Sequence, residues 1–233
     1  MNTCMILAGG TGSRTELDIP KQFIEIEGKP IICYSADAFD RCDMVDSIMV
    51  VVHPEWLSYV EYWVRKTGIS KMKFLVEGGA TRKRSILNGL VKAREFMVDS
   101  DIIMIHDSAR PLVNPDVIIN CIKTAILKNS SLPVIKVTDS IYISDDGRYL
   151  NRTMPKSLNY IGQTPACFNF GMYYRVNTAP GIGAINENSS CDSWFDSGFE
   201  VAIVEGDPET YKITSREDVE KFRKKIMGLD EVR

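Results

Sequence analysis

The sequence predicts an α/β fold, a doubly wound and mostly parallel Rossmann-like sheet with a protruding β-hairpin arm. Short apolar segments alternate with segments of helical pattern through the first half of the chain, which is typical of right-handed crossovers between parallel strands. Polar or glycine-rich clusters at 8–14, 78–85 and 106–111 each follow an apolar segment, at the edge of the sheet where such folds bind ligands. An Asp146-Gly147 pair then predicts a hairpin that breaks the alternation.

Each predicted element has a local signal. Short, mainly apolar segments indicate strands, and these lie at 4–7, 47–52, 72–76, 102–105, 132–137 and 199–205. The continuous run at 47–52 is typical of a strand covered on both faces. Helical periodicity, an early proline or a capping sequence indicates helices, which are expected at 31–39, 54–66, 85–96, 115–127, 170–176, 191–197 and 216–227. Ser215 and Asp218 are expected to cap the last helix. The hairpin is expected to pair 141–143 with 148–150.

The domain organisation and the composition limit the function classes. No repeat or linker divides the chain, so we expect a single domain, 1–233, with a β-arm insertion at about 138–162. The net charge of −3 does not favour nucleic-acid binding, and neither a membrane-spanning stretch nor a signal-peptide pattern is found. The six cysteines form no Cys-x-x-Cys pair, and we expect them to be buried residues of a cytoplasmic protein, not a disulfide framework or zinc site.

The most informative stretch is the glycine-rich segment after the first strand, which is closed by Pro20-Lys21-Gln22-Phe23. Glycines let the backbone turn and present its N–H groups to an anion, and Arg14 and Lys21 add two cations. This combination suits a polyphosphate. The segment lacks the last glycine of a dinucleotide fingerprint and the Gly-Lys-Ser/Thr of a Walker loop. A glycine-rich connection with two solvated cations is the structural alternative.

Further charged residues are expected at the carboxyl ends of other strands. Arg110 and Lys212 add cations. Asp107, directly after a predicted strand, is the expected ligand of a magnesium ion (Mg2+), and Asp207 is a weaker second candidate. Such a set suits phosphoryl or nucleotidyl transfer, which requires mainly positioning and charge stabilisation from the protein.

Some neighbouring residues have simpler interpretations. His106 lies at the end of a buried strand and is expected to be structural rather than a catalytic base. The run Arg82-Lys83-Arg84 fits either a phosphate site or a solvated face, with Ser85 at the following helix start as the finer contact. Trp56 and Trp63 are expected to cover the core.

Taken together, the motifs resemble those of a known enzyme family. The following occur in order across nearly the whole chain: Leu-Ala-Gly-Gly-Thr-Gly-Ser-Arg, Pro-Lys-Gln-Phe, Gly78-Gly79 with Arg82 and Ser85, His-Asp-Ser-Ala-Arg-Pro, Asp139-Ser140, Gln-Thr-Pro and Lys212-Ile213-Thr214. They are similar to the cytidylyltransferases that make CDP-activated polyols from 2-C-methyl-D-erythritol 4-phosphate or ribitol 5-phosphate. The resemblance implies a nucleotidyltransferase fold and the magnesium-dependent transfer of CMP from CTP to a polyol phosphate.

The resemblance also implies roles for individual residues. The nucleotide-binding set is Ala8, Gly9, Gly10, Thr11, Gly12 and Ser13 at the triphosphate, with Gly79, Ala80 and Ser85 at the cytosine. The catalytic set is Arg14, Lys21 and Lys212, of which the first two would stabilise charge on the α-phosphate. The acceptor set is Asp107, Arg110, Ser140, Lys156 and Thr164, in which Asp107 would also position the magnesium ion.

Four positions depart from the family pattern. Lys156 stands in place of an arginine and keeps the charge without the bidentate geometry; Ala166, Asn188 and Thr210 are the others. They belong to the acceptor half or lie beside the metal, which indicates an acceptor other than 2-C-methyl-D-erythritol 4-phosphate or a relaxed acceptor preference. The segments 28–32 and 54–56 look closer to the ribitol-phosphate branch, so ribitol 5-phosphate or a related polyol phosphate is the expected acceptor. The alternatives are 2-C-methyl-D-erythritol 4-phosphate, a glycerol phosphate, a non-catalytic CTP-binding sensor and a metal-dependent glycosyltransferase.

The arm predicts an assembly. A lone hairpin that exposes Ile141, Ile143, Tyr149 and Leu150 would be marginally stable. Exchange with an identical arm across a two-fold axis would bury both apolar faces. In the family the arm reaches across a dimer, so we expect a homodimer in which Ser140, with Lys156, serves the neighbouring site.

Overall fold

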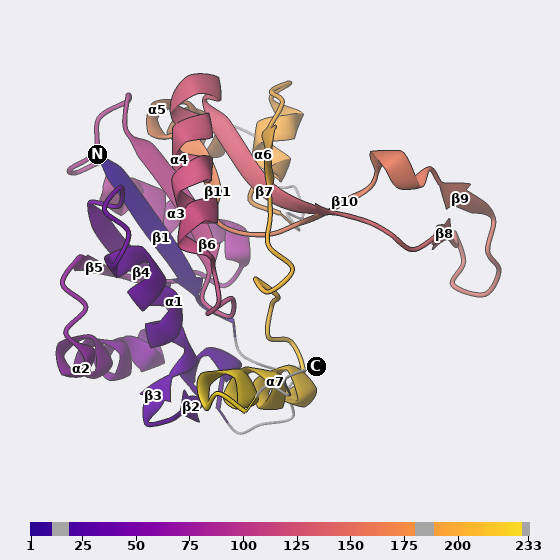
Figure 1. Cartoon of the computed structure of the whole chain (residues 1–233). Coiled ribbons are helices and arrows are strands. Elements are labelled where there is room, and N and C mark those ends of the chain that lie inside the picture. The colour runs from indigo at the N-terminus through magenta and orange to yellow at the C-terminus, as the bar shows by residue number, and fades with distance from the viewer. Residues whose placement is uncertain (11–18, 180–188, 230–233) are drawn as a thin grey trace.

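The computed structural model describes residues 1–10, 19–179 and 189–229. Within these residues the centre is an eight-stranded sheet in the order β10-β7-β11-β6-β1-β4-β5, and β12 pairs with β7. β1 (Asn2–Ala8) lies between β4 (Ser47–Val52) and β6 (Ile102–Asp107), parallel to both. Every residue of β1 after Asn2 is buried, so the first strand lies in the interior of the sheet (Figure 1).

The outer strands complete a mostly parallel sheet. β5 (Met72–Glu77) pairs in parallel with β4, and β12 (Ala202–Glu205) pairs in parallel with β7 (Ser130–Lys136). β10 (Tyr160–Gly162) and β11 (Ala166–Asn169) run antiparallel to their neighbours. The predicted sheet is confirmed. The two antiparallel strands were not predicted, because three or four residues carry too little periodicity to be recognised.

Helices cover both faces, which confirms the doubly wound prediction (Figure 1). One core cluster includes residues of α1 (Ile31–Asp40), α2 (Leu57–Thr67) and α4 (Pro115–Lys128). A second, on the opposite face, includes residues of α3 (Arg82–Ala93), α5 (Phe170–Thr178) and α6 (Asp192–Asp196). A third joins α7 (Arg216–Ile226) to α1 and to the small ribbon of β2 (Glu25–Ile26) and β3 (Lys29–Pro30).

The arm is present, but its second strand lies further along the chain than predicted. β8 (Ile141–Ile143) pairs with β9 (Arg152–Met154), not with 148–150. The carboxylate of Asp146 accepts the N–H groups of Arg148 and Tyr149 at 2.8 and 3.0 Å, so this stretch forms a loop and not a strand. The 3-10 turn η3 (Lys156–Leu158) then leads into β10, and the arm extends well away from the sheet (Figure 1).

Several element boundaries also differ from the prediction. β6 includes His106 and Asp107, which therefore end the strand instead of following it. α3 begins at Arg82 and ends at Ala93, before the predicted end near Phe96. The predicted helix at 54–66 is a 3-10 turn, η2 (Pro54–Trp56), followed by α2. β12 begins at Ala202 instead of residue 199.

The structure also bears on the cysteines and on membrane-spanning segments. All six cysteines are buried free thiols, as expected. Among the residues that the structure describes, no helix combines the length and the apolar character needed to cross a membrane.

Candidate functional site

The end of β1 is held by a side chain of the Pro-Lys-Gln-Phe segment. Gln22 is 2% exposed, and its Nε2 donates to the carbonyl oxygens of Ala8 at 2.9 Å and Gly10 at 2.8 Å. The amide thereby fixes the first residues of the glycine-rich loop relative to the turn that follows. Residues 11–18 lie outside the described part of the chain, and with them the predicted ligands Thr11, Gly12, Ser13 and Arg14.

Lys21 lies in the 3-10 turn η1 (Lys21–Phe23), which aromatic packing holds in place. The ring of Phe23 stacks on Trp56, with centroids 4.4 Å apart, and meets Tyr59 edge-on at 5.4 Å. Both aromatic partners come from the segment of η2 and α2. Trp56 thus covers the core as predicted and also supports the backbone from which Lys21 projects.

The second predicted loop meets the first through Ser85. The Ser85 hydroxyl accepts the N–H of Gly79 at 3.0 Å and donates to the carbonyl of Thr81 at the same distance. A Cβ on Gly9 would lie 3.4 Å from this hydroxyl, and one on Gly79 would lie 2.1 Å from Cγ of Arg84. Only glycine therefore fits at Gly79, and the loops after β1 and β5 lie in contact, as the positions of their clusters predicted.

Asp107 is the electrostatic centre of the site. Its Oδ1 lies 2.7 Å from Nη1 of Arg82, and its Oδ2 lies 2.8 Å from Nζ of Lys212. The Nε of Arg110 is 3.9 Å from the same Oδ2. Burial alone would raise the pKa of Asp107, but the charges of Arg82 and Lys212 outweigh it and hold the pKa well below its usual range.

His106 has the structural role that was predicted for it. Its Nε2 lies 3.1 Å from the carbonyl oxygen of Arg110, which can only accept, so Nε2 carries the proton. Nδ1 then accepts from the Thr164 hydroxyl at 2.9 Å, and the same hydroxyl accepts the N–H of Asp107 at 3.3 Å. Burial lowers the pKa of His106 to about 4, so the ring is neutral at neutral pH.

Thr164 is accordingly buried and its hydroxyl is directed at the end of β6. It positions the backbone of Asp107 through the chain of hydrogen bonds just described. Contact between Thr164 and an acceptor phosphate stays a prediction.

Arg110 and Lys212 are brought to Asp107 by the segment that precedes α7. The Ile213 N–H donates to the carbonyl of Ala109 at 2.8 Å, and Nη1 of Arg110 donates to the carbonyl of Thr210, also at 2.8 Å. These contacts join two stretches about a hundred residues apart in the chain, Ala109 to Ile213, at one edge of the sheet. The predicted convergence of Asp107, Arg110 and Lys212 is confirmed by these distances.

The two candidate magnesium ligands, Asp107 and Asp207, both contact other protein groups. Both oxygens of Asp107 are engaged by cations. Asp207 instead accepts from Nδ2 of Asn114 at 3.0 Å and from the N–H of Glu209 at 2.9 Å. No group of three His, Cys, Asp or Glu side chains that could hold a metal ion occurs in 1–10, 19–179 or 189–229. Because magnesium needs only one or two carboxylates beside phosphate oxygens and water, its coordination by Asp107 stays a prediction.

The arm residues lie away from this cluster within one chain. Ser140, exposed, immediately precedes β8, and Lys156, also exposed, follows β9. The Nζ of Lys156 donates to the carbonyl of Thr138 at 3.1 Å and so joins the two stems of the arm. Because the arm extends away from the body (Figure 1), these two predicted site residues are not brought to Asp107 of the same chain.

Comparison with known proteins now decides the family. A family model described as "IspD: 2-C-methyl-D-erythritol 4-phosphate cytidylyltransferase" matches residues 3–225. The chain belongs to this family. It is therefore a CTP-dependent cytidylyltransferase, and the resemblance that its motifs carry is confirmed.

The relatives of this cytidylyltransferase are named for two different acceptors. A ribitol-5-phosphate cytidylyltransferase of Streptococcus agalactiae serotype III (strain NEM316) is 31% identical over 227 residues, which cover 96% of this chain and 94% of the relative. A 2-C-methyl-D-erythritol 4-phosphate cytidylyltransferase of Clostridium acetobutylicum is also 31% identical, over 220 residues and 94% of both chains. A solved 4-diphosphocytidyl-2C-methyl-D-erythritol synthase of Anaerococcus prevotii shares the fold, with a TM-score of 0.81, 21% identity and coverage of 97% and 98%.

Sequence reasoning did not assign two residues of the candidate site. Gln22 was read only as part of a motif, although a buried glutamine beside a glycine-rich loop is a natural partner for exposed carbonyls. The sequence was compatible with Arg82 in either a phosphate site or a solvated face, yet the residue pairs with Asp107. Its place at the first residue of α3, directly after the loop, was the available signal.

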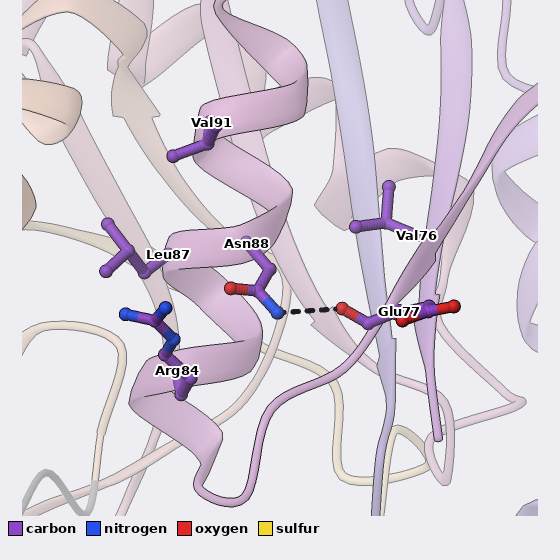
Figure 2. A pocket seen from close by; sticks show the side chains of 6 residues that line it. All are labelled: Val76, Glu77, Arg84, Leu87, Asn88 and Val91. Atoms are coloured by element: carbon purple, nitrogen blue, oxygen red, sulfur yellow. Dashed lines mark hydrogen bonds between the residues drawn. The ribbon is translucent and has the colours of Figure 1, made fainter. Parts of the chain in front are cut away.

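Figure 2 shows a pocket on the outer side of α3, beside the end of β5. Its lining residues are Val76, Glu77, Arg84, Leu87, Asn88 and Val91. Asn88 donates from Nδ2 to the carbonyl of Glu77 at 2.9 Å and fixes the strand end before the Gly78-Gly79 turn. The pocket adjoins the Gly78-Gly79 turn through Arg84, but none of the cations around Asp107 lines it.

Proposed function

We propose that this cytidylyltransferase transfers CMP from CTP to ribitol 5-phosphate. A phosphate oxygen of the acceptor would attack the α-phosphorus of CTP in line. The bond from that phosphorus to the oxygen bridging to the β-phosphate breaks, and its electron pair leaves with pyrophosphate. The products are CDP-ribitol and pyrophosphate. The observation that carries this proposal is the gathering of Arg82, Arg110 and Lys212 on one buried carboxylate beside two glycine-rich loops.

The nucleotide is proposed to bind at the contact between the loops after β1 and β5. The triphosphate would lie on the backbone from Ala8 onward, with Arg14 and Lys21 stabilising charge at the α-phosphate. Support comes from Gln22, which fixes the carbonyls of Ala8 and Gly10, and from Ser85, which fixes the N–H of Gly79. These anchors leave the cytosine to be read by backbone groups near Ala8, Gly79 and Ala80.

The acceptor is proposed on narrower grounds, because relatives with either acceptor name are 31% identical to this chain. The segments 28–32 and 54–56 resemble the ribitol-phosphate branch, and Trp56 supports the turn that carries Lys21. Thr210, one of the four departures, is buried, and its carbonyl accepts from Arg110. The alternative acceptor is 2-C-methyl-D-erythritol 4-phosphate, which the name of the Clostridium relative favours.

The decisive experiment measures pyrophosphate release from CTP with a panel of polyol phosphates, each with magnesium and with a chelator in its place. Ribitol 5-phosphate should give the highest kcat/KM. A higher value with 2-C-methyl-D-erythritol 4-phosphate would replace ribitol by that acceptor. Tight CTP binding without release for any acceptor would instead favour the CTP-binding sensor.

We also propose a homodimer formed through the arm. The support is a set of large apolar side chains that the described structure leaves exposed there: Tyr142, Tyr149, Leu150, Met154, Leu158, Tyr160 and Ile161. Large apolar side chains gathered on an exposed segment are typical of a protein–protein interface. Pairing with an identical arm would cover it and would bring Ser140 and Lys156 to the site of the partner, where they would bind the acceptor phosphate.

The proposal also includes how a magnesium ion enters the site and in which compartment the protein is located. Because both oxygens of Asp107 are engaged by Arg82 and Lys212, we expect a magnesium ion to enter with the triphosphate, whose oxygens it prefers. The six buried thiols suit a reducing compartment, and we propose the cytoplasm.

A further inference from the structure

Arg82 links three segments of the site that are far apart in the sequence. It is the first residue of α3, directly after the loop proposed to read the base. Its guanidinium reaches Asp107 at the end of β6 through Nη1, at 2.7 Å, and Ser190 before α6 through Nη2, at 2.9 Å. We propose that Arg82 is a positioning residue that keeps Asp107 aimed and paired, so that Lys212 is free to leave this carboxylate for a substrate phosphate. This inference rests on the proposed transfer to a polyol phosphate and adds a role that the function alone does not assign.

Arg82 is held at its guanidinium by Ser190 and at its backbone by the cap of α3. Ser190 is 5% exposed, and its carbonyl accepts the hydroxyl of Tyr173 at 2.9 Å. The backbone of Arg82 is fixed by the cap of α3, where the Thr81 hydroxyl accepts the N–H of Arg84 at 3.1 Å. A planar guanidinium held at two points loses little further freedom when it orients a carboxylate. Arg82 is therefore suited to a fixed role.

Lys212 is the more mobile partner of the same carboxylate. It reaches Oδ2 with a single amine at the end of a flexible side chain that is 40% exposed, against 29% for Arg82. An amine of this kind turns readily toward a new anion. When a phosphate arrives, Lys212 can exchange Asp107 for it at a modest cost.

The exchange requires that Asp107 keep a cation. The residue is 8% exposed, and a buried carboxylate left without a partner is strongly destabilised. With Arg82 on Oδ1, the carboxylate stays paired while Lys212 moves. Without Arg82, Asp107 would hold Lys212 more firmly and compete with the acceptor phosphate for it. The expected effect therefore falls on acceptor binding and turnover, and not on the affinity for CTP.

A direct contact between Arg82 and the triphosphate is the competing interpretation. It predicts that removing the guanidinium weakens CTP binding as much as turnover. A purely structural role predicts instead a loss of thermal stability with parallel losses in every kinetic constant. The three interpretations differ in which constant changes, so they can be separated by measurement.

The test compares Arg82→Gln, Arg82→Lys and Ser190→Ala with the wild type, using whichever polyol phosphate supports turnover. Arg82→Gln should lower kcat/KM for the acceptor at least about tenfold, while the Kd of CTP changes less than about threefold. Arg82→Lys should restore most of the loss because it keeps the charge. Ser190→Ala, which removes only the second anchor, should have a smaller effect in the same direction.

Arg94→Gln is the matched control, since Arg94 directly follows α3 and pairs with Asp99 on the surface at 2.5 Å. It should leave all the constants unchanged. A CTP affinity that falls in step with turnover in Arg82→Gln would overturn the inference, and so would a failure of Arg82→Lys to restore activity. If Arg82→Gln does not fold, Arg82→Lys and Ser190→Ala still decide through the same two constants. An error in the proposed acceptor is detected separately by the acceptor panel, in which the wild type would then prefer a polyol phosphate other than ribitol 5-phosphate.

Discussion

Lys21 is held by its neighbours more firmly than an ordinary surface lysine. Gln22 bonds back to Ala8 and Gly10, and Phe23 stacks on Trp56. A cation on such a fixed backbone can be placed where negative charge develops during the reaction, which is the main way in which proteins assist phosphoryl transfer.

Replacing Lys21 by alanine should lower kcat at least about a hundredfold, or roughly 2.7 kcal/mol of transition-state stabilisation. The Kd of CTP should change much less, because the ground-state triphosphate retains the loop backbone. Steady-state kinetics with equilibrium binding of CTP measures both. Lys123→Ala, on the exposed side of α4, is the control. Equal losses in kcat and in affinity would make Lys21 a binding residue only.

Ser85 carries the second prediction at this scale. Its hydroxyl satisfies the Gly79 N–H and ties the loop to Thr81, so Ser85→Ala leaves a polar group unpaired and loosens the proposed base pocket. The KM for CTP should rise about tenfold while a purine nucleotide remains a poor substrate for the wild type. Turnover of ATP or GTP at rates comparable to that of CTP would remove the proposed base recognition.

At the scale of elements, the start of the closing helix α7 was predicted correctly from a local signal alone. The Ser215 hydroxyl accepts the N–H of Asp218, and the Asp218 carboxylate accepts the N–H groups of Thr214 and Ser215, which completes the predicted capping box. Burial would raise the pKa of Asp218, but these hydrogen bonds lower it below its ordinary value.

The cap predicts a pH-dependent stability. Because the pKa of Asp218 is lower in the folded chain, its contribution is present above the unfolded value of about 3.9 and is lost as the pH falls through the folded value. At neutral pH, Asp218→Asn should lower the free energy of unfolding by about 1 kcal/mol, and the difference from the wild type should shrink in acid. Glu217→Gln, one residue earlier, is the control in urea denaturation. A difference that is independent of pH would contradict the assignment.

The arm gives the second prediction at the scale of elements. Deleting 142–150 behind a short turn should yield a monomer that binds CTP but transfers CMP poorly, because Ser140 and Lys156 would no longer reach a partner. Light scattering and the acceptor KM measure the two effects. Replacing Tyr149 and Leu150, which are 76% and 68% exposed, by serine should act in the same direction. Leu127→Ser, at an equally exposed apolar position on α4, should not. A fully active wild-type monomer at micromolar concentration would refute the arm-mediated dimer.

The elements differ in how well the sequence could predict them. The buried parallel strands at the centre of the sheet were recognised because four or five apolar residues follow one another, as in 4–7, 48–52 and 102–105. The second strand of the arm was misplaced because Asp146 and Gly147 indicate a tight turn, whereas the Asp146 side chain organises a wider loop. Asp107 and Lys212 were found from their positions at strand ends. The partner of Asp107, Arg82, was not assigned, because a contact between residues 25 positions apart is set by tertiary packing alone.

At the scale of the whole molecule, the topology explains why one site draws on so many segments. β1 pairs with β4 and β6, so the loops after β1 and β6 emerge side by side, and β5 follows next to β4. The segment before α7 then returns to the same edge through the Ile213–Ala109 hydrogen bond. Parallel pairing at the centre thus determines which distant residues meet, and the helices on both faces hold that edge in place.

The three cations that share Asp107 have a consequence for the protein without substrates. Arg82, Arg110 and Lys212 together exceed the single charge of Asp107, so mutual repulsion opposes folding until an anion is bound. Pyrophosphate should therefore raise the melting temperature in proportion to the logarithm of its concentration, whereas chloride at matched ionic strength should not. The leaving group would then act as a ligand of the resting enzyme and slow the forward reaction as it accumulates. Sustained synthesis would depend on an enzyme that hydrolyses pyrophosphate.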